Sequence, residues 1–255
     1  MRPYTPEAAY VPMPPVKPPV RQFGIRMGGC EAPLEDLLKQ SMVMCPADQC
    51  YTLVEVGSAG CTTLRAFKDI ISETRGQAPW RVIGFDLPPD KAWSLDMEEV
   101  RRNGVEHIIT EPEIQAPYEN VLSLILIDDP RQYIRDTFPF SIQFAFIDGS
   151  HGKSCGLDFL ALEQKISPGG LVVFHDYGEI EQGTDWQTVD REFINVRTYV
   201  HRLGLAKPCN EERKGWRFVG EIQGSRVTGR GDGNSAAVVQ RTWEPLGSQP
   251  KLSLD

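Results

Sequence analysis

The stretch that decides the fold is Gln143–Tyr177, QFAFIDGSHGKSCGLDFLALEQKISPGGLVVFHDY. It contains two short apolar runs, Phe144–Ile147 and Leu171–Phe174, which are typical of buried strands. A helical segment, Ser154–Ile166, lies between them and is followed by Ser-Pro-Gly-Gly, a sequence that ends helices. The pattern predicts two parallel strands joined by a crossover helix.

Each of these predicted strands ends at an aspartate that has a histidine close by. Asp148 ends the first strand and is followed by His151, and Asp176 ends the second and is preceded by His175. Parallel strands joined by a crossover helix have their carboxyl ends at one edge of the sheet, where ligands bind. A single aspartate in such a place usually caps a loop or a helix. Two matched strand ends favour a functional site instead.

A glycine-containing turn follows another predicted strand, Tyr51–Val56. Gly57 and Gly60 allow the backbone to approach a ligand closely, Ser58 offers a hydroxyl, and Glu55 lies near the end of the strand. Many α/β proteins need such a turn for geometry alone. The spacing differs from GxGxxG, which argues against a nicotinamide or flavin enzyme.

The next predicted strand, Arg81–Phe85, ends at Asp86. An acid in this position, more than about 20 residues beyond the glycine turn, is placed to accept hydrogen bonds from ribose hydroxyls. Together with the turn and Glu55, Asp86 therefore predicts a site for an adenosine-like ligand.

The remaining periodic segments continue the alternation of helices and strands, which predicts an α/β fold. The further predicted helices cover Pro33–Met44, a segment from Thr62 to about Arg75, Ser94–Arg102, Gln132–Arg135 and Val189–Leu203. The further predicted strands lie in Val105–Thr110, Val121–Asp128 and Gly215–Ile222. Asp129 follows one of these strands and is placed to contact an adenine edge.

The pattern divides the chain into one domain between two tails. Residues 1–32 are rich in proline and predict an extended tail, or an arm packed on a neighbouring subunit of a homo-oligomer. Residues 33–223 form the predicted catalytic domain. Within it, residues 87–121 exceed a simple connection and predict an insertion that shapes a substrate pocket or acts as a lid. Residues 224–255 show little periodicity and predict a second tail.

Composition narrows the class of protein. With 255 residues, 40% apolar and 24% charged, the chain can bury one core. A net charge of -8 argues against a nucleic-acid partner and favours a small-molecule acceptor. No apolar run approaches the ~20 residues of a membrane span, so no membrane partner is expected. Six cysteines without a CxxC pair, and the lack of a cationic leader, favour reduced thiols in a cytoplasmic protein. Cys45 and Cys50 leave a zinc site or a disulfide as alternatives.

Four motifs, VEVGSAGCTT, GFDL, FIDGSH and PGGLVVFHDY, resemble the class I S-adenosylmethionine (SAM)-dependent methyltransferases. The similarity is to the branch of small-molecule O-methyltransferases that includes macrocin-type sugar methyltransferases and cephalosporin hydroxylase-like proteins. It covers residues 33–223. The resemblance implies a Rossmann-like, seven-stranded, mostly parallel sheet with helices on both faces and flexible tails outside it.

The resemblance also implies roles for the strand-end residues. It places Glu55, Gly57 and Gly60 beside the methionine moiety of SAM, Asp86 on the ribose and Asp129 near the adenine. The first motif departs from the family pattern, because only two residues separate its glycines instead of the common three.

In metal-using relatives, the acids that end the fourth and fifth strands bind Mg²⁺, and the matching positions here are Asp148, His175 and Asp176. A histidine replaces one acid, and Mg²⁺ prefers hard oxygen ligands, so dependence on Mg²⁺ or another divalent metal stays open. We assign Asp148 to both the cofactor-binding and the catalytic set.

These features predict an O-methyltransferase that acts on a hydroxyl of a small metabolite, such as a sugar or a natural-product scaffold. Removal of the hydroxyl proton requires a base, for which His151 is the first candidate and His175 the second. Either histidine could instead only fix a loop. Two other functions compete: a non-catalytic binding or regulatory protein, which the short first motif favours, and a metal-dependent hydroxylase at Asp148, His175 and Asp176, which would hold iron.

Overall fold

The structure is a computed structural model of the 255-residue chain. The residues that it describes are 31–92, 95–111, 117–149, 153–177, 191–206, 212–223 and 235–243. The proline-rich segment 1–30, where we predict a tail or an arm, lies outside the described residues.

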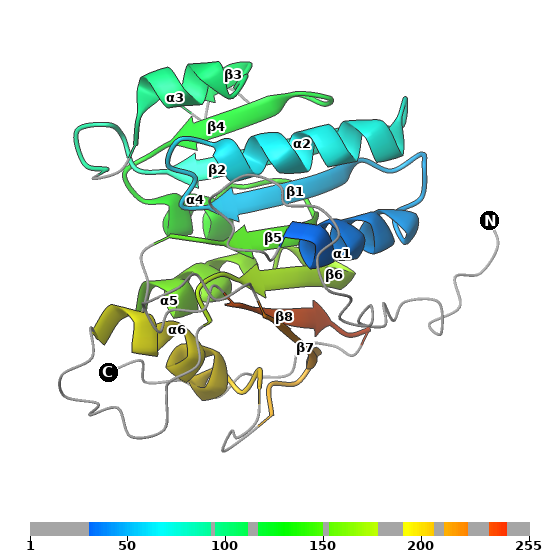
Figure 1. The fold of residues 1–255 in the computed structure, drawn as a ribbon, viewed down its shortest axis with the longest axis vertical. Coiled ribbons are helices and arrows are strands. Elements are labelled where there is room, and N and C mark those ends of the chain that lie inside the picture. Colours follow the sequence, from blue (N-terminus) through cyan, green and yellow to red (C-terminus); the bar gives the residue numbers. More distant parts are fainter. Residues whose placement is uncertain are drawn as a thin grey trace.

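One mostly parallel sheet forms the centre of the molecule (Figure 1). Its strands are β1 Tyr51–Val56, β2 Trp80–Asp86, β3 His107–Ile109, β4 Leu122–Leu126, β5 Ile142–Ile147, β6 Ile166–Phe174, β7 Trp216–Gln223 and β8 Ser235–Arg241. The order across the sheet is β3-β4-β2-β1-β5-β6-β8-β7. The pairs among β1 to β6 are parallel, whereas β8 runs antiparallel to both β6 and β7. The predicted Rossmann-like α/β sheet is confirmed, with eight strands instead of seven.

The additional strand, β8, corrects the prediction that residues 224–255 form a tail. Ser235–Arg241 inserts between β6 and β7, and all but the last of its residues are buried. Its run of small and β-branched residues, SAAVVQR, is short and surrounded by polar sequence, so it shows little periodicity in the sequence. The tertiary pairing with β6 and β7 decides its conformation.

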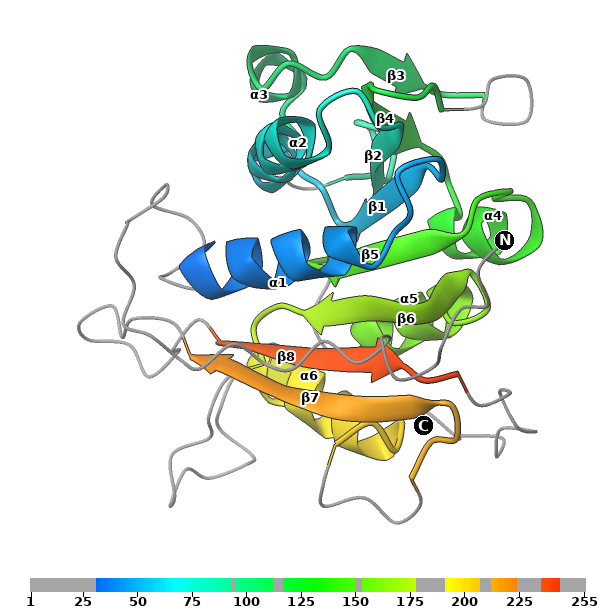
Figure 2. The ribbon, with the colours of Figure 1, turned by 90° about the vertical axis from the view of Figure 1, so that its right-hand side faces the viewer.

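Helices cover both faces of the sheet, as Figure 2 shows from the side. They are α1 Glu31–Val43, α2 Thr62–Arg75, α3 Met97–Arg102, α4 Pro130–Asp136, α5 Lys153–Leu162 and α6 Arg191–Arg202. Residues of α1, α2 and α3 pack in one apolar cluster and residues of α4, α5 and α6 in another, on opposite faces. Phe67 of α2, for example, packs edge-on against Phe144 and Phe146 of β5. Because both faces are covered, β1 is buried along its whole length.

The join between α5 and β6 differs from the sequence prediction. The helix ends at Leu162 instead of Ile166, and β6 already begins at Ile166. The Ser-Pro-Gly-Gly segment is therefore part of the strand. Pairing with β5 shifts there, from Ile142–Ile166 to Phe144–Leu171, so the proline and glycines form an irregularity within the strand.

The segment 87–121, predicted to be an insertion, adds two elements in its described part. Helix α3 packs in the same cluster as α2, and β3 pairs with β4 at the edge of the sheet. A role for this segment as a lid stays a prediction. In the described part of the chain, no helix is long and apolar enough to cross a membrane.

Candidate functional site

The turn between β1 and α2 brings two strand ends into contact. Gly57 has a φ of 88°, in the left-handed region that favours glycine. A Cβ at this position would lie 2.2 Å from the Cα of Gly149, so no side chain fits. Beside it, the N–H of Asp148 donates to the carbonyl of Val56 at 3.0 Å. The glycine turn is therefore held directly against the residues that follow β5.

The rest of this turn is tight and strained. Ala59 and Cys61 have φ values of 41° and 62°, although neither is glycine. Such conformations cost roughly 1–3 kcal/mol each and are found most often at functional sites. The N–H of Cys61 donates to the carbonyl of Ser58, which closes the turn. With only two residues between Gly57 and Gly60, the chain must bend sharply to enter α2.

Asp86 at the end of β2 holds the turn in place. Its Oδ2 accepts the N–H of Ala59 at 2.8 Å, and its Oδ1 accepts the N–H of Leu87 at 2.7 Å. Burial raises the pKa of Asp86, and these backbone donors act in the opposite direction. A carboxylate oxygen accepts more than one hydrogen bond, so both oxygens retain capacity for a ligand.

Glu55 near the end of β1 is a buried acid with an unsatisfied oxygen. The residue is 1% exposed, and its Oε2 has no hydrogen-bond partner. Burial, followed by the negative charge of Asp148, raises the pKa of Glu55 well above its ordinary value. A buried carboxylate oxygen without a donor is costly, and a cationic group of a ligand would satisfy it. This site therefore fits the ammonium group of an amino-acid moiety such as that of SAM.

Helix α3 supports the glycine turn from the side, which the sequence did not predict. Nδ2 of Asn103 donates to the carbonyl of Gly60 at 2.6 Å and to the hydroxyl of Thr62 at 3.1 Å. The same hydroxyl donates to Glu99 at 3.0 Å. Periodicity predicts the helix, but no sequence signal connects these side chains with a turn about 40 residues earlier.

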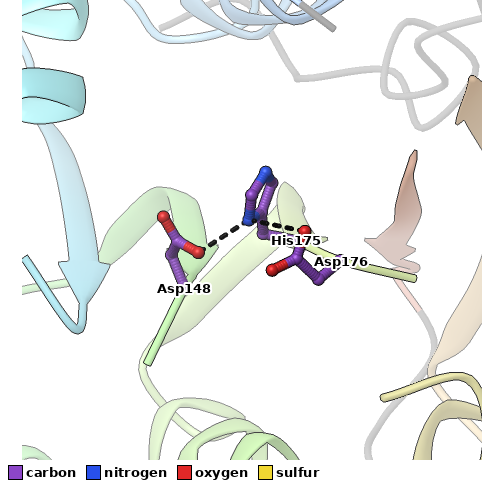
Figure 3. Close-up of side chains that lie close together, drawn as sticks. All are labelled: Asp148, His175 and Asp176. Carbon is purple, nitrogen blue, oxygen red and sulfur yellow. Dashed lines mark hydrogen bonds and ion pairs between the residues drawn. The ribbon is translucent and has the colours of Figure 1, made fainter. Parts of the chain in front are cut away.

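The predicted partners at the ends of β5 and β6 do meet (Figure 3). Nδ1 of His175 lies 2.7 Å from Oδ1 of Asp148 and 3.4 Å from Oδ1 of Asp176. The three side chains are 10%, 27% and 15% exposed, respectively. Burial alone would lower the pKa of His175, but the hydrogen bonds and charges of Asp148 and then Asp176 raise it to about 10.

The backbone fixes this cluster as well. The N–H of His175 donates to the carbonyl of Ile147 at 3.0 Å, which continues the pairing of β6 with β5. Asp176 has a φ of 52°, a left-handed conformation that aspartate tolerates better than most residues. Because the carboxylates accept at Nδ1, the proton lies on that nitrogen. The other ring nitrogen, Nε2, is buried without a hydrogen-bond partner and points away from both carboxylates (Figure 3).

A partly buried ion pair between α4 and α5 was also not predicted. Nε of Arg131, on α4, donates to Oδ1 of Asp158 at 2.6 Å, and its second amino group donates to the carbonyl of Ser154. A Cβ on Gly149 would lie 3.6 Å from Oδ2 of Asp158. The pair therefore joins α4 to α5 close to Gly149.

Three further predictions have different outcomes. His151, the first candidate for the base, lies outside the described residues. Asp129 caps α4, since its side chain accepts the N–H of Gln132 at 2.9 Å, and its place near an adenine stays a prediction. Cys45 and Cys50 are both free, so the disulfide alternative is wrong.

The side chains of the predicted metal site can be compared with the ligands that Mg²⁺ prefers. Among the described residues, one group of side chains could hold a metal ion: Asp148, His175 and Asp176. Mg²⁺ prefers oxygen ligands in octahedral geometry, whereas this set supplies only two carboxylates and places a nitrogen between them. A distance of 2.7 Å between Nδ1 and Oδ1 is that of a charge-assisted hydrogen bond. The set does not fit Mg²⁺.

A comparison with protein families agrees with this arrangement. Residues 54–177 match a family described as a methyltransferase domain. The matched segment runs from β1 to the residue after Asp176 and contains both strand-end clusters. This segment is thus similar to a methyltransferase domain, in agreement with the resemblance predicted from the sequence motifs.

Solved structures share the fold. An O-methyltransferase from Bacillus cereus, in complex with S-adenosylhomocysteine (SAH), is 14% identical, with a TM-score of 0.55 over 88% of this chain and 84% of that chain. TomG from Streptomyces achromogenes, an O-methyltransferase of tomaymycin synthesis in complex with SAM, is also 14% identical, with a TM-score of 0.51 over 83% and 81%. At such identities the likeness establishes the fold. The comparison with curated proteins finds no match.

Proposed function

We propose that the protein transfers the methyl group of SAM to a hydroxyl of a small metabolite, such as a sugar or a natural-product scaffold. The observation that carries this proposal is the buried Oε2 of Glu55, which has no partner and lies beside a glycine turn tied to Asp86. An apolar core does not need such an acid. A ligand that is both an amino acid and a nucleoside would use both carboxylates.

The cofactor would bind across the ends of β1 and β2. In this proposal Glu55 accepts from the ammonium group of SAM, and Asp86 accepts from the ribose hydroxyls. The backbone at Gly57 and Gly60 and the hydroxyl of Ser58, which is buried without a partner, complete the contacts with the methionine moiety. Asp129 would approach the adenine. Asp148, held against the glycine turn, would border both the cofactor and the acceptor.

SAM supplies an electrophilic methyl group on a sulfonium. The acceptor oxygen forms a bond to the methyl carbon while the bond from carbon to sulfur breaks, which leaves SAH, and the hydroxyl proton passes to a base. The protein must align the acceptor with that carbon and receive the proton. We assign the proton to His151, with His175 as the alternative, because Nδ1 of His175 is already engaged by two carboxylates.

Two observations support a small acceptor in the cell interior. The net charge of -8 disfavours a large polyanionic substrate, so we propose a small molecule and no nucleic acid. The four cysteines in the described part of the chain are free, which supports a cytoplasmic location.

The test is an assay of SAM turnover with a mixture of hydroxylated small molecules. The purified chain should convert SAM to SAH, and mass spectrometry should place a labelled methyl group on an oxygen of one acceptor. SAM binding without any turnover would favour the binding or regulatory protein. Iron in the purified protein, together with a hydroxylated product, would favour the hydroxylase.

A further inference from the structure

The ends of β5 and β6 bring two carboxylates into one small, largely buried cluster. Asp148 and Asp176 both lie within 3.4 Å of the same ring nitrogen, and their side chains are 27% and 15% exposed. Two carboxylates this close together disfavour each other's charge unless a proton or a cation lies between them. The described residues around this cluster must therefore supply a positive or hydrogen-bonding group.

That group is on the chain itself. Nδ1 of His175 lies between the two carboxylates, as Figure 3 shows, at 2.7 Å from one and 3.4 Å from the other. The backbone N–H of His175 continues the parallel pairing with β5, which fixes the position of its Cα at this edge of the sheet. Its ring also packs against Phe146, with centroids 5.6 Å apart.

We propose that the Nδ1–H group of His175 bridges Asp148 and Asp176 and takes the place of a divalent cation in this cluster. A metal ion bound there would have to displace the proton that joins Nδ1 to Asp148. It would gain only two oxygens and one nitrogen from the protein, a set that suits Mg²⁺ poorly. The proposal deepens the proposed function, because it makes methyl transfer at this site independent of divalent metal.

The bridge gives His175 a positioning role. It holds Asp148 at the end of β5, where Asp148 also donates its backbone N–H to Val56 at the start of the glycine turn. The acceptor side of the site is thereby joined to the cofactor side without an ion. The other ring nitrogen, Nε2, is buried without a hydrogen-bond partner and takes no part in this bridge.

The experiment measures metal binding without SAM or acceptor. Melting temperature and calorimetry are recorded for the full chain with EDTA, Mg²⁺, Mn²⁺ and Zn²⁺. The wild-type protein should show no saturable shift with any of them. His175→Glu, which supplies a third carboxylate, should melt lower in EDTA and rise by roughly 5 °C at saturating Mg²⁺. The double variant His175→Glu, Asp148→Asn should lose that rise, which would locate the ion.

A second variant allows the proposal to be tested even if His175→Glu does not fold. His175→Asn keeps an N–H donor near the position of Nδ1 and should still bridge Asp148, so it should fold and remain insensitive to Mg²⁺. Saturable binding of Mg²⁺, Mn²⁺ or Zn²⁺ to the wild-type protein, lost in Asp148→Asn, would overturn the proposal even if His175→Glu does not fold. SAM binding is measured separately in EDTA. Its failure would overturn the proposed function and leave the metal result intact.

Discussion

The carboxyl edge of the sheet has two halves, one at the ends of β1 and β2 and one at the ends of β5 and β6. Both contain buried carboxylates, but the two halves differ in whether the protein itself provides partners for them. At the end of β1, the buried carboxylate of Glu55 has an oxygen without a partner, and a strained turn lies beside it. At the ends of β5 and β6, two carboxylates are joined by a histidine from the same chain. The first half is incomplete without a ligand, whereas the second half satisfies its own acids. Under the proposed function, the unpartnered acid of the first half binds the cationic group of the ligand.

The largest effect should come from the contact between the halves. Gly57→Ala places a Cβ 2.2 Å from a backbone atom at a φ of 88°, so the strand ends must separate. We expect the free energy of unfolding to fall by roughly 3–5 kcal/mol. Gly149→Ala is the matched control, because its Cβ would meet ordinary contacts of 3.5 Å or more. If chemical denaturation gives the same loss of unfolding free energy for both variants, a close contact between Gly57 and Gly149 is contradicted.

Asp86→Asn should weaken the cofactor half alone. The amide retains only one acceptor oxygen and no charge, so we expect SAM affinity to fall roughly 10- to 100-fold in calorimetry. Asp136→Asn, on the exposed end of α4, serves as the control and should leave the affinity unchanged. If Asp86→Asn binds SAM with the affinity of the wild type and has a normal melting temperature, Asp86 does not contribute to SAM binding.

The variant Glu55→Gln tests how much the ionisation of the unpaired Glu55 lowers the stability of the fold as pH rises. The folded-state pKa of Glu55 is raised above its unfolded value. Its ionisation therefore destabilises the fold as pH rises above the unfolded pKa, and this loss is complete above the folded pKa. The variant lacks this term, so at pH 8 and without ligand it should be more stable than wild type, by an amount on the order of 1 kcal/mol. It should also bind SAM more weakly.

A paired buried glutamate provides the control for this experiment. Glu163 accepts both Nε and an amino group of Arg213, at 2.7 and 2.6 Å. Glu163→Gln should therefore lose stability at neutral pH, because it leaves a buried guanidinium without its counter-charge. If Glu55→Gln and Glu163→Gln both lose stability in thermal unfolding, Glu55 already has a partner in the folded protein.

Asn103→Ala should give the smallest effect. It removes the hydrogen bonds from α3 to Gly60 and Thr62, which are worth about 1 kcal/mol in stability. We expect SAM affinity to fall by a few-fold, because the turn becomes less ordered before binding. Asn103→Asp, which cannot donate, should resemble the alanine variant. An unchanged affinity in both would limit α3 to a packing role.

Local sequence patterns predicted the strand ends well, because each parallel strand is a continuous apolar run that stops at a polar residue. Asp86, Asp148 and Asp176 could be assigned in this way, and topology then brought the last two together with His175. Glu55 lies inside β1 and could be assigned from its place beside the glycine turn. β8 could not be predicted in the same way, since its pairing with β6 and β7 is made across the whole sheet. The links from Asn103 to Gly60 and from Arg131 to Asp158 are likewise tertiary, and no local period encodes them.

The most direct test of the contrast between the two halves is calorimetry of SAM binding to the wild-type chain, once in EDTA and once with Mg²⁺. We predict one SAM per chain, bound with the same affinity under both conditions. The cofactor half would then be completed by SAM, and the other half by His175. Absence of SAM binding under both conditions, or binding that requires Mg²⁺, would contradict this account.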